Sequence, residues 1–155
     1  YEIVSGALNK ITESGAVLSG APEESIRILH EYAYNLGLAF QVVDDILDFI
    51  GTEQELGKPA GADLMQGTFT LPAMLLRERY PQERAVKDLF RSKDGKADIK
   101  KVIDLVRNTR EITDECYRIA SEYCSRACRD LNKLPNNASR QSLFELAEYV
   151  VRRKN

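Results

Sequence analysis

Apolar residues recur at helical spacing along almost the whole chain. One stripe lies near the N-terminus and consists of Ile3, Val4, Ala7, Leu8 and Ile11. Two more lie in the second half: the first is Ile99, Val102, Ile103 and Val106, and the second is Ile112, Cys116, Ile119, Tyr123, Ala127 and Leu134. Spacing of i, i+3, i+4 and i+7 is that of one helix face. No stretch alternates as a half-buried strand would, and no internal repeat is visible. We therefore predict an all-α fold, a bundle of roughly six or seven helices.

Proline and glycine indicate where these helices begin and end. Pro22, followed by two glutamates, fixes a helical φ and places acids at the positive end of the helix dipole, and the helix that it begins is expected to reach Ile50. Thr52–Thr68 is rich in glycine and is predicted to form a long ordered loop. A helical pattern resumes over Leu71–Tyr80 until the next proline ends it. Turns are predicted at Asp94–Gly95 and Pro135–Asn137, with a last helix after the second turn.

Composition narrows the class of protein. The chain has 155 residues, which suits one domain or a piece of a larger one. A net charge of −2 gives no electrostatic footprint for nucleic acid, so no nucleic-acid partner is expected. No apolar stretch is long enough to cross a bilayer and no signal peptide opens the chain. Three cysteines without a CxxC pair fit reduced thiols that pack in the core. We therefore expect a cytoplasmic protein.

Three aspartates on an apolar helix are the candidate ligands of a metal ion. Asp44 and Asp48 are four residues apart and share one face of the helix, with Asp45 beside them and Gln41 one turn earlier. Carboxylates this close repel each other, and burial adds a desolvation penalty, so a cation is expected among them. Oxygen ligands without histidine or cysteine favour Mg²⁺ over zinc. We expect Asp44 and Asp48 to line one open cavity.

The alternative is an ordinary acidic face in solvent, but the flanking residues are too apolar for that. The glycine-rich loop strengthens the metal-site interpretation, because it places Lys58 and Asp63 shortly after the aspartates. A lysine near a bound metal ion can hold phosphate oxygens as a compact positive charge. Gly-Lys-Pro by itself is common in turns, so the loop is informative only in combination with the helix.

These motifs, in this order, resemble the trans-isoprenyl diphosphate synthases, and among them the long-chain solanesyl- and decaprenyl-type enzymes. The resemblance extends from about Gly15 to the C-terminus, and the residues that carry it are Gly37–Gln41, Asp44–Asp48, Gly57–Pro59, Gly61–Leu64, Gly67–Pro72 and the basic tail Leu146–Lys154.

The resemblance implies Mg²⁺-dependent head-to-tail prenyl transfer, in which isopentenyl diphosphate extends an allylic prenyl diphosphate. By this resemblance, the second aspartate-rich motif of the family consists of Asp44, Asp45 and Asp48. Their carboxylates, together with that of Asp63 in the loop, would bind magnesium. Asp44 would be the direct ligand. Gln41 would face the reacting carbons and the diphosphate, and Lys58 would hold the allylic diphosphate. Asp44, Lys58 and Gln41 are thus the expected catalytic residues.

The first aspartate-rich motif of the family, with the arginine pair that follows it, has no counterpart here. Residues 1–155 therefore resemble the C-terminal part of a single all-helical synthase domain, and we expect the chain alone to be inactive. The Lys-Thr pair of the family is also missing at Ile3–Val4. Either other residues replace this pair, or the sequence joins two segments of the family near Glu13–Ser14. The second explanation arises because Tyr1–Thr12 resembles an earlier helix of the family.

The family also implies a homodimer, with peripheral membrane association through the product. Two other functions remain open. A terpene-cyclase-like enzyme would share the aspartates on a helix, but the loop up to Pro72 resembles elongating synthases. A catalytically incompetent helical subunit is favoured by the missing first motif and disfavoured by the intact set of aspartates.

Overall fold

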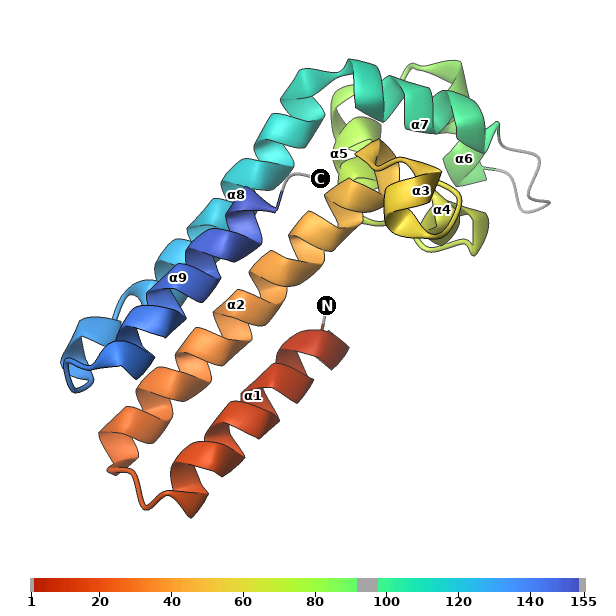
Figure 1. Ribbon diagram of the computed structural model, residues 1–155. Coiled ribbons are helices and arrows are strands. Elements are labelled where there is room, and N and C mark those ends of the chain that lie inside the picture. Colours follow the sequence, from red (N-terminus) through yellow and green to blue (C-terminus); the bar gives the residue numbers. More distant parts are fainter. Residues whose placement is uncertain (1, 92–97, 154–155) are drawn as a thin grey trace. The chain divides into compact units, whose positions relative to one another are not determined.

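The computed structural model describes residues 2–91 and 98–153, and all regular structure in these ranges is helical, as predicted (Figure 1). The elements in chain order are α1 (Glu2–Leu18), α2 (Glu23–Ile50), α3 (Glu53–Leu56), α4 (Ala62–Met65), α5 (Leu71–Arg79), α6 (Arg84–Arg91), α7 (Ile99–Asn108), α8 (Arg110–Cys128), the 3-10 helix η1 (Leu131–Lys133) and α9 (Ala138–Arg152). The predicted turn at Asp94–Gly95 lies outside the described residues. None of the described helices is long and apolar enough to cross a membrane.

The chain divides into two compact units, which α2 and α8 both enter. One unit contains the chain up to Val43 and from Tyr117 onward, and the other contains Asp44–Cys116. The candidate acids and the glycine-rich loop all belong to the second unit.

In the first unit, α1, α8 and α9 lie lengthwise along α2 (Figure 1). α1 approaches α2 closely, because a Cβ atom at Gly37 would lie 2.5 Å from the Cα of Ser5. The hydroxyl of Tyr32 donates to the carbonyl of Leu143 at 2.8 Å, which ties α2 to α9. α9 begins at Asn137, whose side chain accepts from the backbone N–H of Arg140. The first two contacts join α1 and α9 to α2.

The second unit has a core of its own. Its apolar side chains come from the last turns of α2, from α4 to α7 and from the start of α8, and they are Phe49, Leu64, Ala73, Leu76, Val86, Leu89, Val102, Ile103, Val106 and Ile112. The i, i+3, i+4, i+7 stripe predicted on α7 forms part of this core: Val102, Ile103 and Val106 are buried there. The core positions the end of α2 and the loop that follows it.

Two predicted elements differ from those observed. The loop Thr52–Thr68 is not entirely irregular, since it contains α3 and α4, two helices of four residues each. The long helix predicted to include Leu134 ends earlier, at Cys128. Leu134 has an extended backbone with ψ of 157°, because the residue before a proline is biased away from the helical region.

Candidate functional site

The three aspartates of α2 have different environments. Asp44 is exposed, whereas Asp45 and Asp48 retain only 7% and 2% of their surface in contact with solvent. The difference follows from the helix: α2 is apolar on most sides here, so acids at successive positions cannot all face water. Two of the three carboxylates are thus buried and need partners within the protein.

The loop after α2 folds back onto the last of these acids. Gly61 adopts a φ of 73°, a left-handed conformation that favours glycine, and its N–H donates to the carbonyl of Asp48 at 2.8 Å. The N–H of Asp63 donates to Oδ2 of Asp48 at 3.3 Å. A Cβ atom at Gly61 would lie 2.5 Å from Cδ1 of Ile103, so any other residue here would also displace that side chain. The loop is therefore ordered and packs against Asp48.

Lys58 supplies the counter-charge of this cluster. Its Nζ lies 2.8 Å from Oδ1 of Asp48 and 3.6 Å from Oδ1 of Asp63. The hydrogen bond to Asp48 raises the pKa of Lys58, and the negative charges of Asp48, Asp63 and Asp44 act in the same direction. Lys58 is consequently protonated at neutral pH. Its side chain remains 42% exposed, so the ammonium group can also be reached from solvent.

Asp45 contacts the start of α5. Its Oδ2 accepts the backbone N–H of Leu71 at 3.3 Å. Thr70 occupies the N-cap position of α5, but its side chain forms no capping bond and its buried Oγ1 has no hydrogen-bond partner in the described part of the chain. An acid near a helix N-terminus also interacts favourably with the helix dipole. Asp45 therefore fastens α5 to α2.

The arrangement fits a hard cation only in part. Within residues 2–91 and 98–153, no group of three or more His, Cys, Asp or Glu side chains is placed to hold a metal ion. The expected open cavity shared by Asp44 and Asp48 is wrong, because Asp48 is buried against Lys58. The donor chemistry is still that of a magnesium site, and Mg²⁺ usually binds one or two carboxylates together with substrate phosphates and water. The exposed Asp44 fits that pattern.

Gln41 lies on α2 one turn before Asp44 and Asp45 and is partly exposed. The residue before it, Phe40, carries the guanidinium of Arg153 over its ring, 4.9 Å from the centroid. This cation–π contact draws the end of α9 onto α2. Arg153 of the basic C-terminal tail thus packs on Phe40, the neighbour of Gln41 in the sequence, within the same unit.

Sequence reasoning missed Arg107. From α7, its Nε donates to the carbonyl of Phe49 at 2.7 Å and its Nη2 to the carbonyl of Gly51 at 3.0 Å. These carbonyls lie in the last turn of α2 and just after it, where no later residue of the helix can pair with them. Arg107 is one of many exposed basic residues, and no pattern in the sequence distinguishes it.

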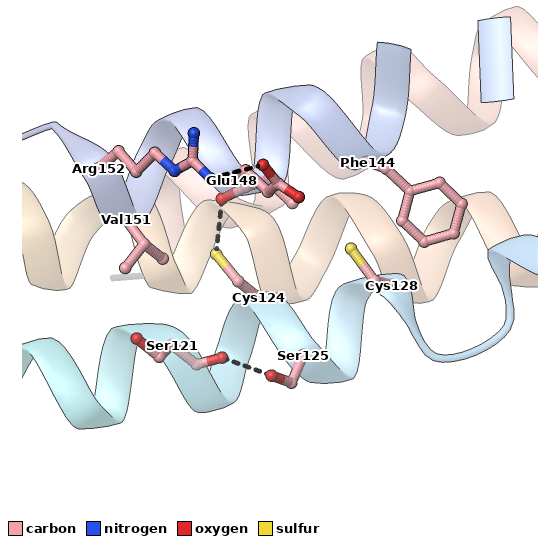
Figure 2. A pocket seen from close by; sticks show the side chains of 9 residues that line it. Ser121, Cys124, Ser125, Cys128, Phe144, Glu148, Val151 and Arg152 are labelled. Carbon is pink, nitrogen blue, oxygen red and sulfur yellow. Dashed lines mark hydrogen bonds and ion pairs between the residues drawn. The ribbon is translucent and has the colours of Figure 1, made fainter. Parts of the chain in front are cut away.

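A separate cavity of about 480 Å³ lies between α8 and α9 (Figure 2). Cys124, Cys128 and Phe144 line it, and Glu148 and Arg152 form an ion pair at 3.2 Å. Burial raises the pKa of Cys124 to about 12, and its Sγ donates to the carbonyl of Ala147 at 3.3 Å. Such a thiol is protonated and a poor nucleophile, so the predicted packing role of the cysteines agrees with this geometry.

The order of the aspartate helix, the glycine-rich loop and α5 is that of a known family. The family model described as "Polyprenyl synthetase" matches residues 6–106, more than half of the chain. The chain belongs to the polyprenyl synthetase family. The resemblance stated from the sequence is therefore confirmed, as is the all-helical fold.

Similar proteins include long-chain prenyl diphosphate synthases. Heptaprenyl diphosphate synthase component 2 of Bacillus subtilis is 36% identical over 140 residues, 90% of this chain and 40% of that protein. Decaprenyl-diphosphate synthase of Dictyostelium discoideum is 38% identical over 141 residues, 90% of this chain and 30% of the other. The crystal structure of heptaprenyl diphosphate synthase from Staphylococcus aureus matches with a TM-score of 0.87 at 32% identity, over 97% of this chain and 47% of that one. This member of the polyprenyl synthetase family thus spans less than half the length of each of these relatives.

Proposed function

We propose that the chain is the C-terminal part of a prenyltransferase that extends an allylic prenyl diphosphate with isopentenyl diphosphate, head to tail, in the presence of Mg²⁺. The observation that carries the proposal is the cluster in which Lys58 contacts Asp48 and Asp63 beside the exposed Asp44. Family membership supports the reaction class. One similar structure, a polyprenyl synthase from Caulobacter crescentus, is described as complexed with calcium and isoprenyl diphosphate.

In this proposal Asp44 is the direct carboxylate ligand of magnesium, and Asp48 and Asp63 assist it. Bound magnesium would stabilise the negative charge that develops on the departing diphosphate. Asp45 was expected to be a ligand as well, but its bond to Leu71 supports a structural role at the start of α5.

Lys58 would bind the diphosphate of the allylic substrate. Its ammonium group is 42% exposed and has three N–H donors, so it can turn from the carboxylates toward phosphate oxygens. Charge-assisted hydrogen bonds to phosphate orient the leaving group before the bond breaks. Gln41, one turn earlier on α2, would contact the substrate with a neutral amide that repels neither the diphosphate nor the developing carbocation.

The partners of the proposed enzyme are its two diphosphate substrates and a second polypeptide. We infer a homodimer in the cytoplasm that associates with a membrane surface only through its long apolar product. The relatives named "component 2" favour a second arrangement, in which a different subunit completes the enzyme.

A catalytically incompetent subunit is the second candidate. It is favoured by the lack of a three-carboxylate metal cluster among the described residues. A chimera distinguishes the two candidates: the chain replaces the matching part of the Staphylococcus aureus synthase, and incorporation of labelled isopentenyl diphosphate is measured. Turnover that Asp44→Ala abolishes supports the transferase. A folded chimera without turnover contradicts it, and product formed by the chain alone would contradict the expectation that it is inactive alone.

A further inference from the structure

Three cations of α5 and α6, in the second unit, share one pocket. Arg77 lies in the last turn of α5, and Lys87 and Arg91 lie four residues apart on α6. All three line a cavity of about 370 Å³, whose floor includes the buried Val86. Residues four apart share a face of a helix, so Lys87 and Arg91 present like charges to the same space.

None of these three cations has a carboxylate partner within the described residues. Elsewhere among the described residues, salt bridges of 4.0 Å or less pair acids with Lys58, Arg79, Arg84, Lys101, Arg118, Lys133 and Arg152. Clustered like charges without a counter-charge repel each other. Within residues 2–91 and 98–153, no acid therefore neutralises the positive charge of this pocket.

Asp88, the acid of α6, and Glu83, which precedes the helix, line a different cavity together with Arg84, and Arg84 pairs with Asp88 at 3.7 Å. α6 thus carries Asp88 toward one cavity and Lys87 and Arg91 toward the other. This segregation is what a site for an anion requires, because a nearby carboxylate would compete with the ligand.

Neutral contacts hold two of the cations in place. The guanidinium of Arg77 lies over the ring of Phe90, 4.7 Å from its centroid, and Phe90 stacks in turn on Phe69 at 4.6 Å. Nζ of Lys87 donates to Oε1 of Gln82 at 2.6 Å. Both contacts orient the cation and leave its charge intact, and a stacked guanidinium keeps its N–H donors directed along the ring plane.

We propose that this pocket binds a diphosphate-type anion. Three positive charges match the charge of a diphosphate group, and planar guanidinium groups suit bidentate contacts with phosphate oxygens. A volume of about 370 Å³ lies within the usual range for small-ligand sites. The site uses none of the residues assigned to prenyl transfer, so it does not rest on the proposed function.

The test is calorimetric titration of the chain with inorganic pyrophosphate in the presence of EDTA, which keeps magnesium from Asp44. Lys87→Gln and Arg91→Gln should each weaken binding by roughly tenfold, since each removes one charge-assisted contact. Arg84→Gln, on the same helix, should leave binding unchanged. Equal binding by Lys87→Gln, Arg91→Gln and the unchanged chain overturns the proposal, and so does an equal loss in Arg84→Gln. Circular dichroism confirms that each variant is folded.

A second titration identifies the source of the phosphate group. Pyrophosphate binding in solution indicates a soluble ligand. Binding only to vesicles that contain phosphatidic acid, lost in Lys87→Gln and Arg91→Gln and absent with phosphatidylcholine alone, indicates a lipid headgroup. Binding to neither pyrophosphate nor phosphatidic acid overturns the proposal.

Discussion

The three aspartates of α2 differ in what their carboxylates contact. Asp44 is exposed, Asp45 accepts the N–H of Leu71, and Asp48 contacts Lys58 and the N–H of Asp63. The spacing of the motif suggests three equivalent ligands. In the structure one acid is exposed, and the two buried acids bind the neighbouring loop and the start of α5. Substitutions at the three positions should accordingly differ in kind.

Asp45→Ala should lower the free energy of unfolding by about 1–3 kcal/mol, because it removes a buried hydrogen bond to the backbone N–H at the start of α5. Asp45→Asn keeps one side-chain oxygen that can accept from the N–H of Leu71, and it should lose less than half as much. Urea denaturation of both variants measures the difference. Equal losses would show that the negative charge, rather than the bond to Leu71, is what α5 needs.

At the scale of elements, the loop between α2 and α5 depends on its glycines in two different ways. Gly61 has a φ of 73° and its missing Cβ makes room for Ile103, whereas Gly57 has a φ of 64° with nothing within 4 Å. Gly57→Ala should therefore introduce backbone strain alone, about 1 kcal/mol. Gly61→Ala adds a clash with a buried side chain and should lower the free energy of unfolding by about 2–4 kcal/mol.

Denaturant titrations of both glycine variants, at matched protein concentration, test this account of the loop. A similar loss in the two variants would mean that Ile103 can move away without penalty, and that the loop is not packed as tightly against α7 as the distances indicate.

The end of α2 depends on Arg107 of α7. Arg107→Ala removes two hydrogen bonds to carbonyls of Phe49 and Gly51 and should lower the free energy of unfolding by about 1–2 kcal/mol. Arg84→Ala is the matched control, since its exposed ion pair with Asp88 contributes less than about 0.5 kcal/mol. If thermal denaturation shows the same change for both, Arg107 does not stabilise the end of α2.

The sequence predicts the long elements well and the short ones poorly. α2 was expected to end at Ile50, and α7 to bury its i, i+3, i+4, i+7 stripe, because both follow from proline, glycine and apolar spacing over many residues. α3 and α4 have four residues each, fewer than an apolar period needs to become visible. The bond from Leu71 to Asp45 joins residues 26 apart and depends on tertiary packing, which spacing within one helix does not reveal.

At the scale of the whole molecule, family membership and the local geometry support the same account. The chain belongs to the polyprenyl synthetase family and spans less than half of the length of the relatives compared. Its second unit brings Lys58 within ion-pair distance of Asp48 and Asp63. The proposed division of labour assigns the metal to Asp44 and the diphosphate to Lys58.

The most direct test is calorimetric titration of farnesyl diphosphate into the chain at low and high magnesium, for the unchanged protein, Asp44→Ala and Lys58→Ala. Losing the charge of Lys58 should weaken binding roughly tenfold to a hundredfold at every magnesium concentration. Asp44→Ala should weaken binding at least as much at low magnesium and recover in part at high magnesium, because its defect is one of metal affinity. Magnesium-independent binding, or Lys58→Ala binding as tightly as the unchanged chain, would contradict the account.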